Sequence, residues 1–371
     1  MIAEACTAGV SALGLLQATA GAALLRQCAR RRDAGPARAV PVTVLKPLHG
    51  DEPLLEQALA SVCRQNYPDW QVVFGVQNAS DGALPTVRRL QAQYPDCNIA
   101  VVVDPTEHGP NRKVGNLINM LPAAEHDVLV IADSDVHVAS DWLRQAVAAL
   151  EIPGVGLVTA VYTGRPVHGL VGMLGACQIN HYFLPGALLA RAMGRQDCLG
   201  ATMMLRRETL DRIGGLHALV DHLADDNVLG RLVQRLGLKV ALAATIPSTT
   251  VPETRLGALW RHELRWARTI RALVPVQFAA SMLQYPLAWA ALTILLAGGA
   301  PWSLAGFVLV WGLRATLVRV TDNLLALANR TPLWLLPLRE LMSVAVMAAS
   351  YAGRRVDWRG HILEAEGYNP R

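Results

Sequence analysis

The stretch that decides the fold is Val128-Leu129-Val130-Ile131-Ala132-Asp133-Ser134-Asp135. Its first five residues have the length and β-branched content of a strand buried on both faces of a parallel sheet. In open α/β sheets, ligands bind at the carboxyl ends of the strands. Two acids there repel each other and are poorly solvated, so the pattern favours a divalent metal that carries a diphosphate. The plainer alternative is a helix N-cap, for which Asp and Ser are good residues.

The sequence around this run alternates between strand and helix patterns. Strands are expected at 42–45, 71–77, 99–103, 128–132, 156–161 and 202–205, and helices at 54–64, 84–94, 112–121, 142–150 and 226–236. Such alternation predicts an α/β fold with a mostly parallel sheet.

The ends of the chain are more apolar than the middle. Hydrophobic residues make up 52% of the 371 residues, which is high for a purely soluble protein and indicates membrane segments. One is expected at 7–25, and arginines follow it at Arg26, Arg30, Arg31 and Arg32. A cleaved signal peptide carries its positive charge before the apolar run. The positive-inside rule therefore predicts an N-terminus outside and a globular domain in the cytoplasm.

Two further spans, 276–297 and 302–320, are expected to form a hairpin. The run 333–352 contains Pro337, Arg339 and Glu340, which lipid would tolerate poorly. If it crossed the membrane, arginines at 354, 355 and 359 would lie outside. We therefore expect an interfacial or re-entrant helix and a cytoplasmic C-terminus.

These patterns divide the chain into four parts. We expect a membrane anchor and basic linker at 1–38, a catalytic domain at 39–255, an interfacial helix at 256–275 and a C-terminal membrane region at 276–371. Six cysteines without CxxC spacing indicate reduced core residues rather than disulfides or a zinc site. The net charge of +5 comes largely from arginines beside apolar segments, which favours an anionic membrane surface over nucleic acid.

Three other elements carry charge at notable places, and each has an ordinary explanation. Asp81 follows the second strand and could share the sheet edge with Asp133, but it could also form an Asx turn before Gly82. Asp225 and Asp226 begin a helix, where acids are electrostatically ordinary. The stretch 260–268 has the pattern of a basic amphipathic helix on a membrane surface.

Together these elements resemble the inverting GT-A glycosyltransferases of family 2 type, which share a D, DxD, D, (Q/R)xxRW pattern. The matching residues are Asp81, Asp133-Ser134-Asp135, Ala224-Asp225-Asp226 and His262-Glu263-Leu264-Arg265-Trp266. The likeness covers roughly 41–274. Within this group of enzymes, the sequence resembles the ceramide glucosyltransferase family most. Narrower still, it points to bacterial hopanoid-associated enzymes that add N-acetylglucosamine to bacteriohopanetetrol. The general resemblance continues at Leu45-Lys46-Pro47-Leu48 and Gly200-Ala201-Thr202, whereas the runs 111–120 and 261–269 carry the narrower likeness.

The resemblance implies a GT-A domain flanked by transmembrane helices and a role for each donor-site residue. Asp135 would bind Mg²⁺ or Mn²⁺, which stabilises the departing diphosphate. Asp133 would contact the ribose or the donor sugar, and Asp81 would hold the uridine of a UDP-sugar. Lys113 would lie near the uracil or the phosphate, and Arg265 would pair with the diphosphate.

The resemblance also assigns the acceptor side of the reaction. Asp226 would be the general base that takes the acceptor proton, and Trp266 would line the acceptor channel. His262 occupies the (Q/R) position and departs from the pattern, because it lacks the bidentate fork of Arg. It could bind a phosphate or hydroxyl, or it could be an ordinary helix-surface residue.

We therefore expect a multi-pass enzyme of the bacterial inner membrane that transfers one N-acetylglucosamine from UDP-GlcNAc to bacteriohopanetetrol. A ceramide glucosyltransferase that uses UDP-glucose is the first alternative. A processive polysaccharide synthase and an inactive membrane sugar-nucleotide sensor are the others.

Overall fold

The computed structural model describes residues 1–31, 39–353, 355–358 and 361–364. Part of the predicted basic linker (32–38) and the arginines at 354 and 359 lie outside the described residues. The chain divides into two compact units, which are described separately. The sheet unit comprises Arg31–Val167 and Gly194–Pro252, and the helical unit comprises Met1–Arg30, His168–Met193 and Glu253–Arg371.

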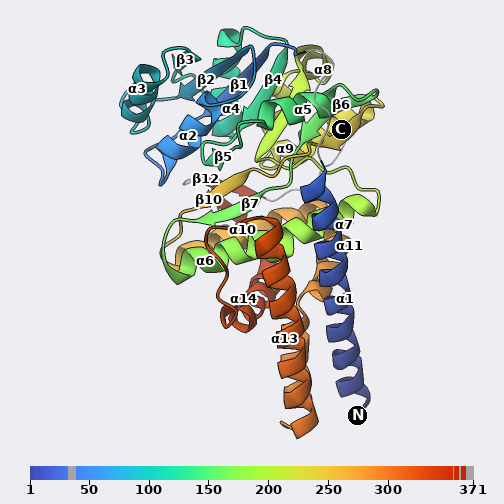
Figure 1. Cartoon of the computed structure of the whole chain (residues 1–371). Helices are drawn as coiled ribbons and strands as arrows, with labels where there is room; N and C mark the ends of the chain where they lie inside the picture. The colour runs from blue at the N-terminus through green and yellow to red at the C-terminus, as the bar shows by residue number, and fades with distance from the viewer. Residues whose placement is uncertain (32–38, 354, 359–360, 365–371) are drawn as a thin grey trace. The chain divides into compact units, whose positions relative to one another are not determined.

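The sheet unit is built on one large mixed sheet (Figure 1). Its strand order is β3-β2-β1-β4-β8-β6-β9, with bounds Asn98–Val103, Trp70–Val76, Val42–Pro47, Val128–Ala132, Thr202–Arg206, Val155–Thr159 and Lys239–Leu242. Strands β1 to β4 run parallel, β8 pairs antiparallel with both β4 and β6, and β6 pairs parallel with β9. The predicted α/β class with a mostly parallel sheet is confirmed, and β8 supplies its antiparallel exception.

Helices cover this sheet because its central strands are apolar on both faces. The helices of the unit are α2 (Leu55–Cys63), α3 (Leu84–Gln93), α4 (Arg112–Met120), α5 (Trp142–Leu150), α8 (Arg207–Arg212) and α9 (Asp225–Arg235). Residues of α2, α3 and α5 share one core with alternate strand residues such as Val44, Phe74 and Val130. On β2, Gly75 lies against Met120 of α4, so its missing side chain allows that helix to approach.

A second, smaller sheet in the unit joins β5 (Val136–His137), β10 (Ser248–Val251) and β7 (Thr163–Pro166). Because β5 begins one residue after Asp135, this sheet fixes the chain as it leaves the acidic motif. The amide of Thr250 donates to the carbonyl oxygen of Asp135 at 3.1 Å.

The helical unit consists of α1 (Ile2–Arg30), α6 (Gly169–Gln178), a π-helical turn (Ile179–Phe183), α7 (Leu184–Ala192), α10 (Leu256–Leu273), α11 (Pro275–Ala280), α12 (Pro286–Leu296), α13 (Pro301–Leu324) and α14 (Leu335–Ser350). It also includes the hairpin strands β11 (Arg355–Trp358) and β12 (His361–Glu364). Its segment His168–Met193 lies inside the predicted catalytic range 39–255 but folds with the membrane-type helices. The predicted domain bounds stay a prediction.

Two helices among the described residues, α1 and α13, are long and apolar enough to cross a membrane. They contain the predicted spans 7–25 and 302–320. The predicted span 276–297 is not one continuous helix, because the chain bends by 70° between 275–284 and 286–296, as in a broken span or a re-entrant loop. Pro286 explains the break, since a proline pushes the residue before it out of helical geometry. Tyr285 accordingly has φ −111° and ψ 68°.

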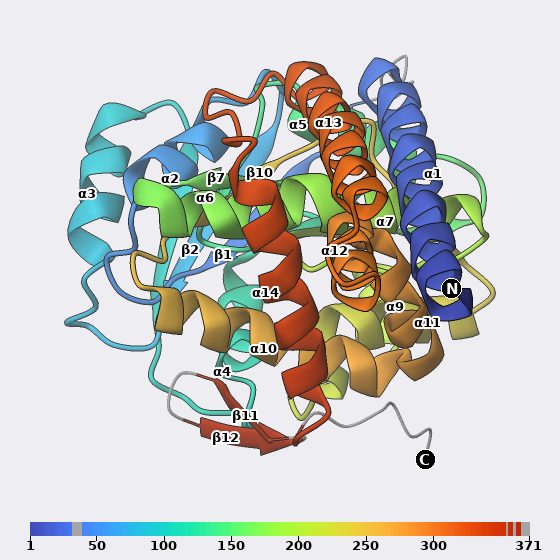
Figure 2. The same ribbon diagram turned by 90° about the horizontal axis from the view of Figure 1, so that it is seen from below.

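Helix α1 is packed into the helical unit and is more than a tether. It runs beside α13 in both views (Figures 1 and 2), and Figure 2 also shows α12 beside it. Its buried residues are mostly small, and two of them carry hydroxyl groups: Ser11 donates to the carbonyl oxygen of Pro286 at 2.8 Å, and Thr7 accepts a hydrogen bond from Thr293 at 2.8 Å. Small residues with interhelical hydrogen bonds are typical of helix packing in membranes.

Candidate functional site

The acidic motifs of the sheet unit follow strands that end at the same edge of the large sheet. Strands β2 and β4 both pair with β1 and run parallel to it, so their carboxyl ends lie at the same edge. Asp81 follows β2, and Asp133 and Asp135 follow β4 directly. The topology therefore confirms that these predicted acids lie on loops at a common edge.

Lys113 joins two of the predicted motifs. Its ammonium lies 2.7 Å from Oδ1 of Asp133 and 3.6 Å from Oδ2 of Asp225. Burial alone would lower the pKa of Lys113, but the two carboxylates outweigh it and raise the pKa above its usual value. Asn111 caps α4 and fixes this arrangement. Its side chain accepts from the amide of Val114 at 3.1 Å and donates to the carbonyl oxygen of His222 at 2.8 Å.

Asp135 is held by the smaller sheet. Its Oδ2 accepts a hydrogen bond from the Thr249 hydroxyl at 2.5 Å. Burial and the neighbouring charge of Asp133 raise the pKa of Asp135 to about 6. A cation bound beside such a carboxylate would stabilise its ionised form.

Those surroundings fit a hard divalent cation. The described residues contain no group of three His, Cys, Asp or Glu side chains that could hold one alone. Mg²⁺ in nucleotide sites is commonly bound by one or two carboxylates, with substrate phosphates completing the shell. A single oxygen ligand from Asp135 with a diphosphate is therefore a chemically suitable donor set.

Asp226 begins helix α9 and is partly buried. Its Oδ1 accepts a hydrogen bond from the amide of Asn227 at 2.7 Å. Burial, followed by the adjacent charge of Asp225, raises the pKa of Asp226 to about 7, although Lys113 opposes the shift. A carboxylate with a pKa near the working pH is suited to general base catalysis.

Asp81 has the plainer role that its sequence context allowed. Its Oδ1 accepts from the amide of Ala83 at 2.8 Å, which is the Asx turn, and from the amide of Gly50 at 2.9 Å. The carboxylate therefore ties the loop after β1 to the loop after β2. Its predicted contact with uridine stays a prediction.

Lys46, in the stretch Leu45-Lys46-Pro47-Leu48, is a further residue of this site for which no role was predicted. It is fully buried, and its ammonium donates to the carbonyl oxygens of Asp133 at 2.8 Å and Val136 at 3.1 Å. Burial lowers the pKa of Lys46 to about 8, while Asp135 and Asp133 act in the opposite direction. A lysine inside the apolar strand Val42–Pro47 was the signal for it, since a buried lysine needs polar partners.

The helical unit contains the remaining predicted site residues, all on α10. Nδ1 of His262 lies 2.5 Å from Oε1 of Glu253, and its ring packs edge-on against Trp266 with centroids 4.6 Å apart. Arg265 is partly buried on the same helix. The contacts of His262 are thus defined within this unit, whereas the predicted binding roles of all three stay predictions.

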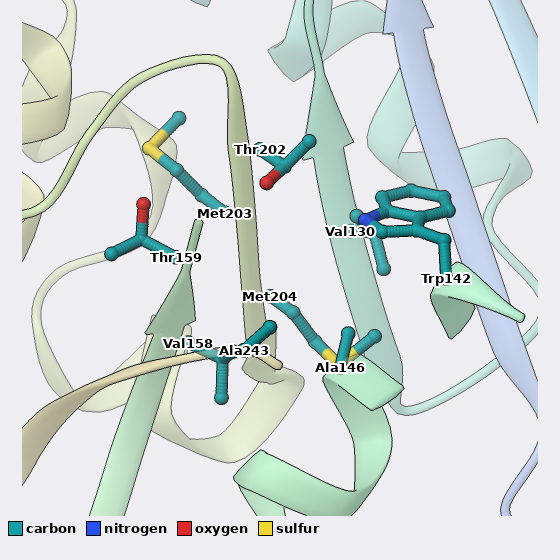
Figure 3. A pocket seen from close by; sticks show the side chains of 9 residues that line it. All are labelled: Val130, Trp142, Ala146, Val158, Thr159, Thr202, Met203, Met204 and Ala243. Atoms are coloured by element: carbon teal, nitrogen blue, oxygen red, sulfur yellow. The ribbon is translucent and has the colours of Figure 1, made fainter. Parts of the chain in front are cut away.

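The cavity in Figure 3 is lined by none of the predicted site residues. It has a volume of about 10 Å³, room for about one water molecule. Its lining residues are uncharged: Val130, Trp142, Ala146, Val158, Thr159, Thr202, Met203, Met204 and Ala243. It is a packing defect between β4, β6, β8 and α5.

Comparisons with known proteins agree with this fold. The mannosyltransferase PcManGT from Pyrobaculum calidifontis, solved in complex with GDP-Man and Mn²⁺, has a similar fold with a TM-score of 0.55 and 21% identity. The match covers 94% of this chain and 99% of that one, and it supports the GT-A fold.

Among curated proteins, ceramide glucosyltransferase 1 of Caenorhabditis elegans is 22% identical over 244 residues, or 66% of this chain and 52% of that protein. The β-monoglucosyldiacylglycerol synthase of Trichormus variabilis is 22% identical over 233 residues, or 61% and 48%. The ceramide glucosyltransferase of Komagataella phaffii is 33% identical over 113 residues, or 29% and 22%. The chain thus spans about half the length of these relatives, or less. The model of glycosyl transferase family 21 matches residues 10–368, and the chain belongs to that family.

Proposed function

We propose that this protein is a membrane-associated glycosyltransferase that transfers one sugar from a UDP-sugar to a hydroxyl group of a lipid. The observation that carries the proposal is the charge cluster at the sheet edge, where Lys113 pairs with Asp133 and Asp225 beside the weakly acidic Asp226. This arrangement combines a lysine that can donate hydrogen bonds to a diphosphate with a carboxylate that can accept a proton.

Within the proposal, each acidic residue has a distinct task. Asp135 would hold Mg²⁺ or Mn²⁺, and the cation would supply positive charge to the leaving diphosphate. Asp133 would contact the ribose or the donor sugar, and Lys113 would shift from the carboxylates toward the phosphates when the donor binds. Asp226 would take the proton of the acceptor hydroxyl as that oxygen attacks the anomeric carbon. Such a single displacement inverts the anomeric centre.

The donor and acceptor are finer points of the proposal. The curated relatives include ceramide glucosyltransferases and a glucosyldiacylglycerol synthase, which favours UDP-glucose and a two-chain lipid such as ceramide over the predicted UDP-GlcNAc and bacteriohopanetetrol. The apolar helices α1 and α13 support a membrane location, and we propose a multi-pass protein of a bacterial inner membrane with the sheet unit in the cytoplasm. Arg265 would pair with the diphosphate, and Trp266 and His262 would contact the acceptor.

A membrane assay of the full chain tests the proposal. UDP-glucose and UDP-GlcNAc are each supplied with ceramide, diacylglycerol or a hopanoid polyol, with and without EDTA. We expect UDP release and a lipid carrying one β-linked sugar, most with UDP-glucose and ceramide, and loss of both with EDTA. Products longer than one sugar would indicate a polysaccharide synthase, and an α-linkage would refute the single displacement. No UDP release with any pair would refute the enzyme assignment and favour a non-catalytic sensor.

A further inference from the structure

Residues 198–201 form a short segment that touches both ends of the candidate site. The carbonyl oxygen of Ala201 accepts a hydrogen bond from the amide of Asp133 at 3.3 Å. One residue earlier, Gly200 lies directly against the carboxylate of Asp226, because a Cβ built on it would come within 2.9 Å of Oδ2. The segment thus contacts the acid assigned to the donor and the acid assigned to the acceptor.

Gly200 is not required by its backbone conformation. Its φ lies outside the left-handed region that favours glycine, so an L residue could adopt the same backbone. The three nearest neighbours of the added Cβ all belong to Asp226: Oδ2 at 2.9 Å, then Cβ and Cγ at 3.4 Å each. The absent side chain therefore makes room for this one carboxylate.

Gly230 forms a second close approach between the same two elements. A Cβ on Gly230 would lie 2.9 Å from Cβ of Cys198 and 3.3 Å from its amide nitrogen. Asp226 and Gly230 are four residues apart on α9 and hence on one face of that helix. The helix therefore meets the segment at Gly200 and again at Cys198, which fixes its first turn.

The segment is held in turn by Thr159, at the end of β6 (Figure 3). The Thr159 hydroxyl donates to the carbonyl oxygen of Leu199 at 2.7 Å and accepts from the amide of Leu199 at 3.0 Å. Thr159 is 1% exposed, so water does not compete for these bonds. This anchoring joins the segment to the rigid sheet.

From these contacts we propose that Gly200 and Thr159 are positioning residues that set where the Asp226 carboxylate stands relative to the donor site. This inference rests on the proposed function, in which Asp226 is the general base. Gly200 leaves the space that the carboxylate occupies, and Thr159 prevents the segment from shifting away. The Asp226 carboxylate is thereby positioned by a neighbouring segment as well as by its own helix.

The test compares Gly200→Ala with Asp226→Asn and with Gly156→Ala in the full-length protein. Gly156 is a matched control, because a Cβ there would crowd the side chains of Leu238 and Val233. For Gly200→Ala we expect kcat to fall about 100-fold, since small misplacements of catalytic groups cost that much. The dissociation constant for UDP should stay within twofold, and the acid limb of the pH–kcat profile should move, because the carboxylate has new surroundings. Gly156→Ala should reduce thermal stability without moving that limb.

Thr159→Val provides a second route to the same result, because it removes both hydrogen bonds to Leu199 without touching Asp226. It should lower kcat more than it changes KM for the UDP-sugar and should also move the acid limb. The inference is refuted if Gly200→Ala and Thr159→Val keep the wild-type acid limb, or if both only lower the amount of folded protein. If Asp226→Asn itself retains the wild-type kcat, the assigned base is wrong and the proposed function fails before this inference does.

Discussion

Replacing Asp226 by Asn should abolish most of the activity and at the same time stabilise the fold. The structure raises the pKa of Asp226 from 3.8 to about 7, chiefly through burial and next through Asp225. When folding raises the pKa of an acid, its ionised form destabilises the folded protein. This loss of folding free energy begins once the pH exceeds the pKa of the acid in the unfolded chain. The cost grows between pH 3.8 and about 7 and is constant above that.

The size of this effect follows from the shift. One pKa unit corresponds to about 1.4 kcal/mol, so the ionised carboxylate costs up to about 4 kcal/mol at pH 8. Water at the partly exposed carboxylate reduces this figure, and we expect a gain of about 1–3 kcal/mol for Asp226→Asn. At pH 4 the gain should be close to zero, because the carboxyl is then protonated in the folded protein.

Activity should change in the opposite direction. A general base typically contributes about 10²–10⁴-fold to the rate, and the loss should fall on kcat. The wild-type kcat/KM should halve near pH 7 and decline about tenfold per unit below it, since Asp226 must be ionised to accept a proton. UDP binding should be little affected.

Both effects are measurable on the detergent-purified protein, the stability without added metal or donor and the activity with metal, UDP-sugar and lipid acceptor supplied. Thermal unfolding is followed at pH 4 and pH 8, UDP binding by calorimetry and turnover by UDP release. Asp127→Asn is a suitable control, because the Asp127 side chain is 93% exposed. An Asp226→Asn variant that is no more stable than wild type at pH 8 would refute the electrostatic argument. Equal losses in UDP affinity and in rate would refute the assignment as base.

Three other substitutions test the supporting structure. Lys46→Met removes the ammonium hydrogen bonds to the carbonyl oxygens of Asp133 and Val136 and should lower the free energy of unfolding by about 2–4 kcal/mol in denaturant titrations; an unchanged midpoint would contradict this. Thr249→Val removes the hydrogen bond that orients Asp135 and should raise the Mn²⁺ concentration for half-maximal activity at least tenfold; wild-type metal dependence would count against the metal assignment. Gly21→Val should destabilise the helical unit by about 1–3 kcal/mol, because a Cβ there meets Pro185 at 2.7 Å. Gly9→Val on the same helix has open space and should match the wild type in the same melting experiment.

Local patterns predicted the sheet unit well because its elements are encoded by neighbouring residues. The apolar run Val128–Ala132 is a strand buried along its length, and the acids that follow it lie at the ligand-binding edge as expected. The contacts of those acids are not encoded in the same local pattern. Thr249 lies 114 residues from Asp135, and Lys46 lies 87 residues from Asp133. Such long-range partners depend on how strands are ordered in the sheet, which a local pattern does not specify.

The charged residues in 333–352 show the same limit of local patterns, because their partners also lie far away in the sequence. Arg339 and Glu340 argued against a lipid-facing span, and both are fully buried inside the helical unit. Arg339 makes a two-pronged ion pair with Glu263 of α10, at 2.7 and 2.8 Å. Glu340 accepts from the amide of Leu287 at 2.6 Å, at the start of α12, where an orphan amide and the helix dipole favour a carboxylate. The residues that excluded a simple span therefore tie α14 to α10 and α12. Because Glu263 lies two residues before Arg265, that ion pair also holds the helix that carries the RW motif.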